Sequence, residues 1–561
     1  MTPREEYSRW LNQAELDPAL KDELVLIGQA PDEIEERFYT SLEFGTAGLR
    51  GILGAGTNRM NVHVVRRATA GLADYVLSFE QGASRGVAIG YDSRENSALF
   101  ALETAKTLAA FGITAHLFPS LRPVPLLSFA LRHLGCIAGV VVTASHNPPE
   151  YNGYKVYWEH GGQTGPGQAD EIYNRMKRFD YFGIQTMTEQ DARRAGLIRT
   201  IGAETDEAYY QATASLLQWP ALLREKGNEC RLVYTPLHGT GLVPVTTLLR
   251  RVGIASLSVV PEQEQPDPRF PTVKAPNPED PNAFTLAVPL ADAAGADAIL
   301  ATDPDSDRMG LAVRDFSGHF RVLTGNKIGC LLLHYLLCSM KEKGTLPADG
   351  FAVKSLVSTR MAEAICKRFG VACYDVPTGF RFISEKIDES VKTGRGTFLF
   401  GFEESYGFLA GGFSRDKDAV CAAMLSAEAC VYYKQQGRTL YGVLCDMADT
   451  YGHFDESVKS YTLAGKEGLA RIASAMEKLR QNPPAAFADI PVEQAEDLLP
   501  DGQNVLRYFL KGGAWMCVRP SGTEPRLKLY IGANETSAAG LDALLAALMR
   551  DADGLLTRLL A

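Results

Sequence analysis

The 561-residue chain contains no uninterrupted apolar stretch long enough to cross a membrane. The best candidate, LLLHYLLCSM at residues 331–340, is too short and contains a histidine. The first sixteen residues, MTPREEYSRWLNQAEL, are polar and lack the apolar core of a secretory signal peptide. We therefore expect a cytoplasmic protein that does not associate with a membrane.

Cysteine motifs are also missing. The ten cysteines are scattered along the chain, with no C-x-x-C pair and no spacing that suits zinc. Five of them lie in apolar, helix-like stretches, where a free thiol packs as a small hydrophobic group: Cys330, Cys338, Cys366, Cys421 and Cys430. These features predict reduced thiols, in agreement with a cytoplasmic location.

Positive charge is scarce, since 57 Lys and Arg against 67 Asp and Glu give a net charge of −10. Bulk electrostatics therefore gives no support for nucleic acid or an anionic membrane as a partner. An anionic ligand would have to be held by positive charge gathered locally. With 46% hydrophobic and 22% charged residues, the composition is typical of a globular protein, and the length requires several hydrophobic cores.

Apolar, β-branched segments alternate with helical segments over most of the chain. The expected strands are residues 86–92, 113–118, 137–143, 230–235, 256–260, 296–302, 351–358 and 397–402. This alternation predicts parallel strands joined by helical crossovers, and the cycle restarts twice. The last hundred residues change character, with expected strands at residues 457–465, 505–512, 514–522 and 526–534.

The predicted fold is α/β, with three similar α/β domains of mixed, largely parallel sheets and a C-terminal α+β domain around one cleft. The expected domains are residues 1–205, 206–318, 319–455 and 456–561. The first of them begins with a charged helix that ends near Phe38. Residues 261–282 are dense in proline and acidic side chains and predict a long surface loop.

Each α/β unit ends an apolar strand in a polar loop. These loops are TASHNP at residues 143–148, ATDPDSDR at 301–308 and GFEESYG at 401–407. Active sites of open α/β sheets lie at the carboxyl ends of the strands. We therefore expect the three loops to converge on one site between the domains.

The first polar loop places Ser145 beside His146, directly after the run VVVTA. This pair suggests either a nucleophile with a base or a turn with polar residues. A serine hydrolase is the weaker interpretation, because the G-x-S-x-G elbow is absent. Adjacent residues on an extended strand also point to opposite sides, so we expect the two side chains to point apart.

The second polar loop places Asp303, Asp305 and Asp307 at alternating positions after a strand. Three carboxylates so close repel one another unless a cation lies among them, so a hard divalent metal is indicated. An EF-hand is excluded because its sixth and twelfth positions are Arg308 and Arg314 instead of glycine and glutamate. With only three carboxylates the coordination shell stays open for a phosphate oxygen, which suits Mg²⁺.

Other segments have the residue types of an anion or sugar site. The C-terminal segment RPSGTEPR combines guanidiniums, hydroxyls and a glycine as a phosphate dianion requires, at Arg519, Ser521, Gly522, Thr523 and Arg526. Arg50 lies in the glycine-rich segment FGTAGLRG, which also suits an anion. Glu403 and Glu404 could bind either a metal or sugar hydroxyls, and Thr378–Gly379 forms a further, weaker loop signal.

Taken together and in order, these segments resemble the α-D-phosphohexomutase family. The resemblance rests on TASHNP with YNGYK, DPDSDR, GFEES and RPSGTEP, and FGTAGLRG and RDKDAV strengthen it. It extends from Phe44 to the C-terminus. The most similar branch is that of the phosphoglucomutases with FGTAGLRG and the PDPRFPTVKAPNPE segment, which also includes phosphopentomutase-like and glucose-bisphosphate-forming members.

The resemblance implies a role for each position. Ser145 would be the phosphoserine, and one of its oxygens would complete an Mg²⁺ site formed by Asp303, Asp305 and Asp307. Residues near the reacting phosphoryl group would be Arg50, Lys155, Arg308 and Lys417, with a supporting contact from His146. Sugar hydroxyls would be bound by Glu403, Ser405, Thr378 and Gly379. The non-transferring phosphate would be held by Arg519, Ser521, Gly522, Thr523 and Arg526.

The implied activity is the interconversion of glucose 1-phosphate and glucose 6-phosphate through phosphoserine and a bound glucose 1,6-bisphosphate, with Lys155 and Lys417 as candidates for the general acid/base. Gly407 occupies the position at which related mannomutases carry a histidine, which favours glucose. Mannose or pentose phosphates are the alternatives within the family. A serine hydrolase or phosphatase, and a silent sugar-phosphate sensor, are alternatives of other classes. We expect small-molecule sugar phosphates as partners and a monomer or small homo-oligomer.

Overall fold

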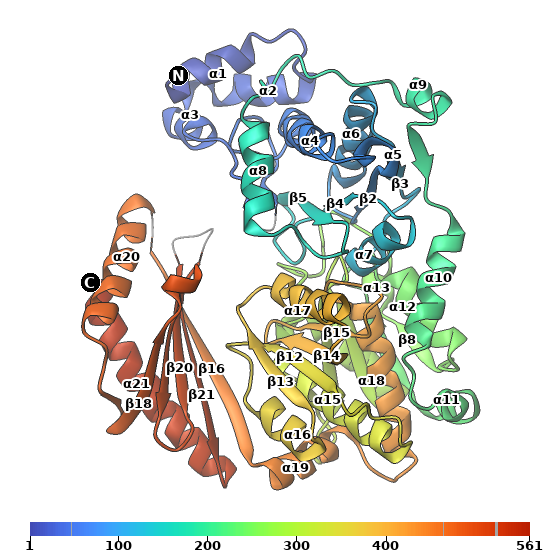
Figure 1. Ribbon diagram of the computed structural model, residues 1–561, viewed down its shortest axis with the longest axis vertical. Helices are drawn as coiled ribbons and strands as arrows, with labels where there is room; N and C mark the ends of the chain where they lie inside the picture. Colours follow the sequence, from blue (N-terminus) through green and yellow to red (C-terminus); the bar gives the residue numbers. More distant parts are fainter. Residues whose placement is uncertain (46–47, 464, 522–525) are drawn as a thin grey trace.

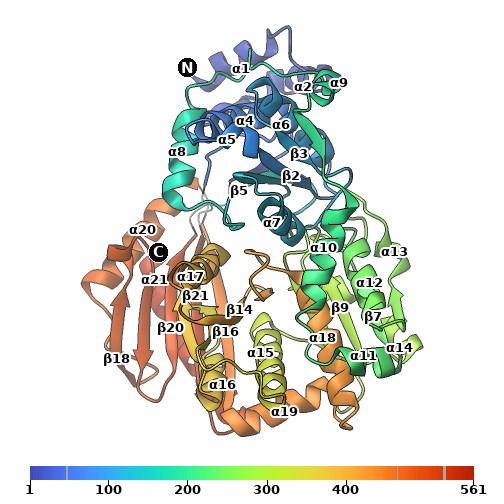
Figure 2. The same ribbon diagram turned by 45° about the vertical axis from the view of Figure 1, so that its right-hand side comes forward.

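The computed structural model describes residues 1–45, 48–463, 465–521 and 526–561. Four β-sheets follow one another along the chain, and helices cover them (Figure 1). The first sheet lies at the top of that view, and the C-terminal sheet lies below it at the left. Turned by 45°, the view shows the third domain between the second domain and the C-terminal domain (Figure 2). The predicted class is confirmed: three α/β domains and a C-terminal α+β domain.

The first sheet has the strand order β1-β5-β4-β2-β3-β6. Strands β4, β2, β3 and β6 are parallel, whereas β5 runs antiparallel to both β4 and β1. The strands are β1 (Leu49–Ile52), β2 (Val87–Tyr91), β3 (Ala115–Leu117), β4 (Ala138–Val142), β5 (Tyr151–Trp158) and β6 (Ile198–Thr200). The helices are α4 (Val62–Val76), α5 (Gly82–Arg85), α6 (Ser97–Ala110), α7 (Val124–His133), α8 (Pro166–Met176), α9 (Glu189–Arg194), α10 (Ala203–Ala214) and α11 (Pro220–Lys226).

Strand β4 is apolar throughout because both of its faces are buried. Val140 and Val142 belong to one hydrophobic cluster with α4 and α6, and Val141 belongs to another with α7. A strand covered on both sides loses the alternation of apolar and polar residues that marks a half-exposed strand. The run that precedes Ser145 therefore reflects its central position in the sheet.

The N-terminal segment forms three short helices, so the expected single helix is wrong. They are α1 (Pro3–Leu11), α2 (Pro18–Leu26) and α3 (Pro31–Phe38). Each begins with a proline, which starts a helix readily but cannot continue one. The last helix ends at Phe38, as predicted. Glu23 of α2 accepts a hydrogen bond from the Ala55 backbone N–H at 2.8 Å, so these helices support the glycine-rich segment next to β1.

The second sheet has the order β11-β10-β9-β7-β8 and the third the order β13-β12-β14-β15. Strands of the second are β7 (Leu232–Thr235), β8 (Leu257–Val259), β9 (Ala298–Thr302), β10 (Met309–Arg314) and β11 (Phe320–Val322), with helices α12 (Leu242–Arg251), α13 (Pro261–Glu264) and α14 (Ala287–Ala294). Strands of the third are β12 (Gly350–Ser355), β13 (Ala372–Val376), β14 (Thr397–Glu403) and β15 (Gly407–Ala410). Its helices are α15 (Gly325–Glu342), α16 (Met361–Phe369), α17 (Phe380–Thr393), α18 (Ala419–Lys434) and α19 (Leu440–Tyr451).

The three polar loops share one structural context. Each joins a strand of the parallel part of its sheet to an antiparallel neighbour: β4 to β5, β9 to β10 and β14 to β15. Each also contains one residue with a left-handed backbone, namely Ser145 (φ 53°), Ser306 (φ 50°) and Tyr406 (φ 66°). Non-glycine residues rarely adopt this conformation and are often functional where they do. The sequence analysis expected the loops but not the antiparallel strands that follow them.

The segment 261–282 is only partly a surface loop. Phe270 is fully buried with φ 46°, and the Arg94 guanidinium lies 5.0 Å from its ring centroid. Between α13 and Pro281 the prolines prevent regular structure, but the apolar side chain of Phe270 still packs against the domain. The expectation of a long exposed loop is therefore wrong for the middle of this segment.

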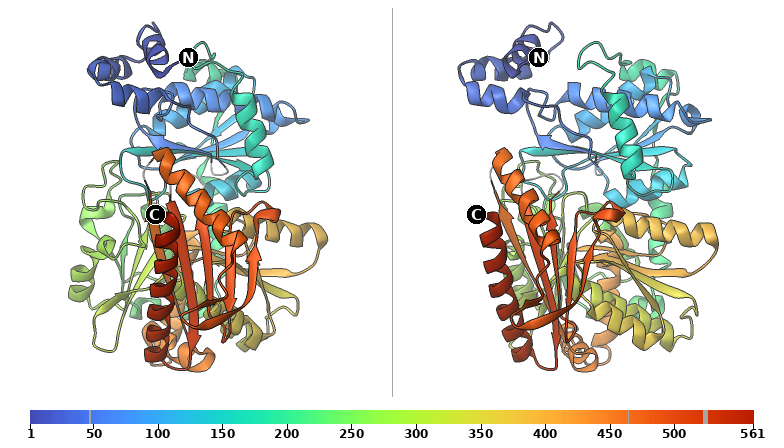
Figure 3. Two further views of the ribbon diagram at one scale, coloured as in Figure 1. Left: turned by 90° about the vertical axis from the view of Figure 1, so that its left-hand side faces the viewer. Right: turned by 60° about the vertical axis from the view of Figure 1, so that its left-hand side comes forward.

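The fourth sheet is antiparallel, with the order β16-β21-β20-β19-β18-β17. Its elements are β16 (His453–Thr462), α20 (Gly465–Gln481), β17 (Ala486–Phe487), β18 (Ile490–Asp497), β19 (Leu506–Leu510), β20 (Trp515–Pro520), β21 (Arg526–Glu535) and α21 (Ala538–Leu560). Helices α20 and α21 cover one face (Figure 3). On the other face Trp515 and Tyr530 pack against Leu356 and Val357, which follow β12 in the third domain.

No helix within the described residues has the length and apolar character needed to span a bilayer. The five cysteines assigned to helices lie on α15, α16 and α18, and all ten thiols are free.

Glu456 lies at the junction of the third and fourth domains. Its carboxylate accepts a hydrogen bond from Asn326 Nδ2 at 2.8 Å, and Asn326 Oδ1 accepts one from the Thr359 backbone N–H at 3.1 Å. Lys327 and Asp455 form an adjacent ion pair at 3.0 Å. Burial raises the pKa of Glu456 from 4.5 to about 7.

We expect Glu456→Gln to stabilise the protein above neutral pH. Because the folded state holds the Glu456 proton more tightly than the unfolded state, wild-type stability falls as pH rises from about 4.5 to about 7. The glutamine variant lacks this loss, so its advantage should be absent near pH 4.5 and reach on the order of 3 kcal/mol above pH 7. Thermal unfolding across this range, with the exposed Glu493→Gln as control, measures the difference. A pH-independent difference would contradict the assignment.

Candidate active site and metal centre

Ser145 is held at the tip of β4 by its own loop. Its backbone N–H donates to Thr143 Oγ1 at 2.8 Å, and its carbonyl accepts from Arg94 at 2.7 Å. Arg94 also donates to the carbonyls of Pro148 at 2.8 Å and Tyr151 at 3.0 Å. A single buried guanidinium therefore fixes the loop conformation. Sequence reasoning missed Arg94, although it too follows an apolar strand that ends in polar residues.

Asp303, Asp305 and Asp307 form a buried cluster in which three carboxylate oxygens lie within 4.8 Å of one another. Asp303 Oδ1 accepts from the backbone N–H groups of Asp307 at 3.1 Å and Arg308 at 2.9 Å. Burial, together with Asp305 and Asp307, raises the pKa of Asp303 well above its usual value. The Oδ1 atoms of Asp305 and Asp307 are buried and have no hydrogen-bond partner among the described residues. This donor set fits a hard divalent cation with oxygen ligands.

The serine loop and the aspartate loop touch. Ser145 Oγ donates to Asp303 Oδ2 at 2.8 Å, and Thr143 Oγ1 lies 3.1 Å from Asp305 Oδ2. The Val124 backbone N–H donates to the Asp305 carbonyl at 2.9 Å, which adds a direct link between the first two domains. The structure thus brings the predicted nucleophile to the predicted metal ligands.

The expectation that Ser145 and His146 point apart is wrong. Ser145 Oγ and His146 Nδ1 lie 3.2 Å apart. The alternation rule holds for extended backbone, whereas the left-handed φ of Ser145 turns the chain so that the two side chains meet. Burial, with Arg308 and Arg50 nearby, lowers the pKa of His146 well below its usual value, which leaves the imidazole neutral.

Two lysine amines compensate the negative charge of the aspartate cluster. Lys155 Nζ, on β5, lies 2.9 Å from Asp305 Oδ2 and 3.5 Å from Asp307 Oδ2. Lys417 Nζ lies 3.1 Å from Asp307 Oδ2 and 3.1 Å from Asp416 Oδ1. Burial lowers the pKa of each amine, but the neighbouring carboxylates outweigh burial and raise it overall.

Asp416 links Lys417 to the first domain, and sequence reasoning missed it. Its Oδ2 accepts from Tyr157 OH at 2.8 Å and Gln163 Nε2 at 3.0 Å. The only sequence signal was its place beside Lys417 in the RDKDAV segment. The Lys417 amine therefore lies within hydrogen-bonding distance of both Asp416 and the Asp307 carboxylate of the aspartate cluster.

The third loop turns its carboxylates toward its own domain. Glu403 Oε1 accepts from the Gly379 backbone N–H at 2.8 Å, and burial raises the pKa of Glu403 to about 7. Glu404 Oε2 accepts from Ser355 Oγ at 2.8 Å. Among the described residues the metal-type cluster consists of the three aspartates alone. Ser405 is half-buried beside these carboxylates, so the loop fits sugar hydroxyls better than a metal.

The arginines occupy two regions. Arg50 donates to Asn147 Oδ1 at 3.1 Å beside the serine loop, and the Arg308 guanidinium pairs with Glu279. In the C-terminal domain the Ser521 backbone N–H donates to the Arg526 carbonyl at 2.7 Å. Gly522 and Thr523 lie outside the described residues.

Charged residues of the C-terminal domain and of the third polar loop interact electrostatically with the same tyrosine. Burial raises the pKa of Tyr530 on β21, Glu404 raises it further, and Arg519 opposes the shift. Glu404 and Arg519 therefore act on the same side chain. The structure gives the C-terminal group no direct contact with Ser145 within the described residues.

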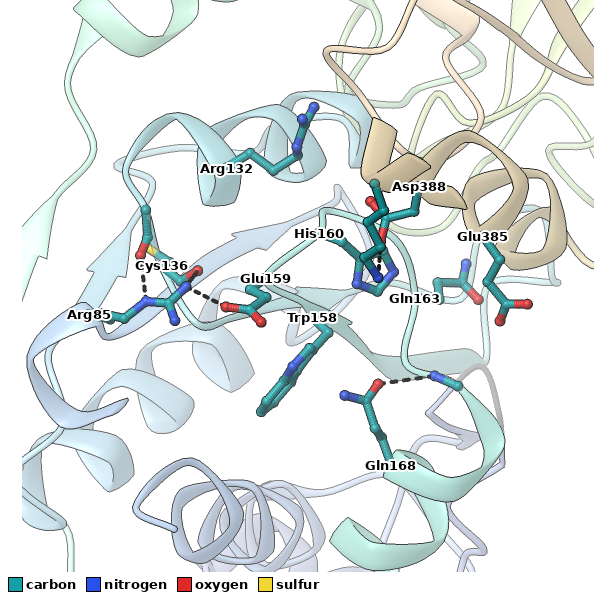
Figure 4. Close-up of a pocket in the computed structure, with 13 residues that line it drawn as sticks. Arg85, Arg132, Cys136, Trp158, Glu159, His160, Gln163, Gln168, Glu385 and Asp388 are labelled. Carbon is teal, nitrogen blue, oxygen red and sulfur yellow. Dashed lines mark hydrogen bonds and ion pairs between the residues drawn. The ribbon is translucent and has the colours of Figure 1, made fainter. Parts of the chain in front are cut away.

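A separate cavity of about 750 Å³ lies between the first domain and α17 (Figure 4). Its lining includes Arg132, His160, Gln163 and Asp388 but none of the residues predicted for the site. Its charged side chains are of both signs, and Arg85 is already paired with Glu159. We therefore place the candidate active site at the aspartate cluster and not in this cavity.

Comparison with known proteins agrees with the four-domain architecture. Four families of the phosphoglucomutase/phosphomannomutase type match the chain: alpha/beta/alpha domain I at residues 41–181, domain II at 207–318, domain III at 324–451 and the C-terminal domain at 472–549. The N-terminal helices α1 to α3 precede the first of these ranges.

Full-length relatives carry the same architecture. The phosphoglucomutase of Staphylococcus epidermidis is 34% identical over 520 residues, which is 90% of this chain and 92% of that protein. The solved structure of the phosphoglucomutase pp63/parafusin from Paramecium, in its open form, matches with a TM-score of 0.70 at 16% identity, over 93% and 96% of the two chains. A phosphoglucomutase/phosphomannomutase family protein from Burkholderia thailandensis gives 0.68 at 18% identity, over 92% and 97%.

The protein is an intramolecular phosphotransferase, an isomerase by class. More specifically, the chain belongs to the phosphoglucomutase/phosphomannomutase family, the α-D-phosphohexomutases.

We expect Asp305→Asn to weaken Mg²⁺ binding by at least about tenfold, because one of the three anionic oxygens is replaced by a neutral amide. Calorimetric titration with Mg²⁺ measures the affinity, and the exposed Asp170→Asn on α8 serves as the control. Equal Mg²⁺ affinity in wild type and Asp305→Asn would contradict the metal assignment.

Proposed function

We propose that this protein interconverts glucose 1-phosphate and glucose 6-phosphate, with Ser145 as the phosphoryl carrier. The observation that carries the proposal is the 2.8 Å contact between Ser145 Oγ and Asp303 within the buried aspartate cluster. A phosphoserine at this position would bring its oxygens to the ligands of a cation. The matching relatives named phosphoglucomutase support the choice of reaction.

Asp303, Asp305 and Asp307 would hold Mg²⁺, which neutralises negative charge on phosphoryl oxygens when it is bound. Phosphoryl transfer depends mainly on positioning and on such neutralisation. Arg94 contributes the positioning, because it fixes the loop that carries Ser145. Arg50 and Arg308, on either side of that loop and the aspartates, contribute positive charge.

Lys155 and Lys417 are the candidates for the general acid/base. Both amines lie against the aspartate cluster, whose carboxylates keep them protonated. Each could give a proton to the sugar oxygen that leaves or stabilise the hydroxyl that attacks. We favour Lys417, because it also neighbours Glu403, a candidate for binding sugar hydroxyls.

The reaction requires the sugar to present either of two oxygens to Ser145. In the first step the phosphoserine donates to a free hydroxyl and a bound glucose 1,6-bisphosphate results. After reorientation the serine takes the other phosphate. Arg519, Ser521, Gly522, Thr523 and Arg526 would hold whichever phosphate is not transferred, and Glu403, Ser405, Thr378 and Gly379 would bind the sugar. Movement of the fourth domain, proposed here as residues 456–561, would permit this exchange.

Gly407 favours glucose over mannose. A Cβ at this position would lie 2.2 Å from Lys417 Cδ, so a larger side chain would force the lysine out of its observed position. Lys417 therefore takes the space in which a histidine would stand in the mannomutase pattern.

We further propose that the other domains are residues 1–205, 206–318 and 319–455, and that the enzyme acts in the cytoplasm as a monomer or small homo-oligomer on sugar phosphates alone.

We expect Ser145→Ala to abolish mutase activity, by a factor of about 10³ or more, with little change in thermal stability. His146→Gln should keep most of the activity, because the proposed carrier needs no histidine base. A coupled assay that follows glucose 6-phosphate formed from glucose 1-phosphate measures both variants. Loss of activity in His146→Gln with release of free phosphate would instead favour a serine hydrolase or phosphatase.

The same assay with mannose 1-phosphate and a pentose 1-phosphate tests the substrate. We expect the highest kcat/KM with glucose 1-phosphate. Absence of turnover with glucose 1-phosphate, alongside turnover of either other sugar phosphate, would overturn the substrate assignment while leaving the phosphoryl carrier intact.

A further inference from the structure

Glu279 is the partner of an arginine that the phosphoryl site needs. Its carboxylate forms an ion pair with the Arg308 guanidinium, and about one third of its side chain is exposed. The Arg308 backbone N–H donates to Asp303, the residue that also accepts from Ser145 Oγ. One arginine thus connects the aspartate cluster to a carboxylate from the proline-dense segment.

The backbone that carries Glu279 is tightly packed. A Cβ built on Gly310 in β10 would lie 2.9 Å from both Pro278 Cβ and the Pro278 carbonyl oxygen, so only glycine permits this approach. The Glu279 backbone N–H donates to Asn277 Oδ1 at 3.1 Å. The chain is therefore fixed next to the strand that follows Arg308, and any displacement of the carboxylate must come from rotation of its side chain.

Arg308 and Glu279 also interact electrostatically with groups of the other domains. Arg308 interacts with the Glu403 carboxylate of the third domain and with His146 of the first. Burial lowers the pKa of Lys528 in the C-terminal domain, and Glu404 and Glu279 oppose that shift. The Glu279 carboxylate is therefore within electrostatic range of the C-terminal domain.

A carboxylate and a phosphate compete for one guanidinium. Both accept hydrogen bonds from guanidinium N–H groups and both carry negative charge, so they compete for the Nη1 group of Arg308 that pairs with Glu279. A phosphate dianion carries more charge than a carboxylate and should win the exchange when additional contacts hold it. An anion with less charge or with fewer additional contacts should not displace the carboxylate from Arg308.

We propose that Glu279 is a positioning residue whose carboxylate occupies the Arg308 guanidinium until the phosphate group of a ligand displaces it. The inference rests on the proposed function, since it takes Arg308 to be a phosphoryl-binding residue. Displacing the Glu279 carboxylate from Arg308 costs free energy. Inorganic phosphate and other small anions therefore bind weakly at the reaction centre. A sugar phosphate gains further contacts through its hydroxyls and overcomes this cost.

The test is equilibrium binding of inorganic phosphate and of glucose 6-phosphate to the full chain in a Ser145→Ala background, so that no turnover occurs. We expect Glu279→Gln to bind inorganic phosphate about fivefold more tightly, as loss of one partly exposed competing ion pair implies. Glu262→Gln, an exposed carboxylate in the same segment, should leave the affinity unchanged. Thermal unfolding of each variant verifies the fold, and Glu279→Ala serves as a second variant.

The gain should depend on the arginine. In an Arg308→Gln background, Glu279→Gln should no longer improve phosphate affinity, as a double-mutant cycle shows directly. Unchanged or weaker phosphate binding in Glu279→Gln would overturn the proposal, and so would a gain that persists without Arg308. Because the readout is binding, failure of wild-type mutase activity would count against the proposed function and not against this competition.

Discussion

The buried cluster of Asp303, Asp305 and Asp307 is the constraint on which the rest of the site depends. Carboxylates so close and so deeply buried are costly unless positive charge and hydrogen bonds surround them. The structure supplies Lys155 from the first domain and Lys417 from the third. Ser145 completes the arrangement with its bond to Asp303. The need to compensate one anionic centre therefore draws three domains to a single point.

The same turn recurs in each α/β domain, although the third domain reaches the cluster through Lys417, which lies after β15. A strand buried on both faces ends in a polar loop, turns through one left-handed residue and returns as an antiparallel strand. Such a turn places side chains at the edge of a rigid sheet instead of on a free loop. At Ser145 it also brings His146 against the serine, although the two lie next to each other in the sequence. Rigid supports explain how loops far apart in the chain hold distances near 3 Å.

Local pattern predicts much of this. The strand ends, the three aspartates and the serine follow from an apolar run that stops at polar residues, and the three α/β units follow from alternation of strands and helices. Arg94 and Asp416 had only a weak local signal, at a strand end and beside Lys417, and Glu279 had none, while partners of all three lie farther away along the chain. The antiparallel strands after each loop were missed because both faces of the sheets are covered, which removes the period-two signal. Prolines in the first forty residues divided one expected helix into three.

Whether Ser145 carries a phosphoryl group can be measured by peptide mapping with mass spectrometry after intact-mass analysis. The peptide that contains Ser145 should gain about 80 Da when the protein is incubated with glucose 1,6-bisphosphate. Excess unphosphorylated acceptor, as glucose 6-phosphate, should remove that mass and yield the bisphosphate. A Ser145 peptide that never gains this mass in a catalytically active preparation would show that Ser145 is not the phosphoryl carrier.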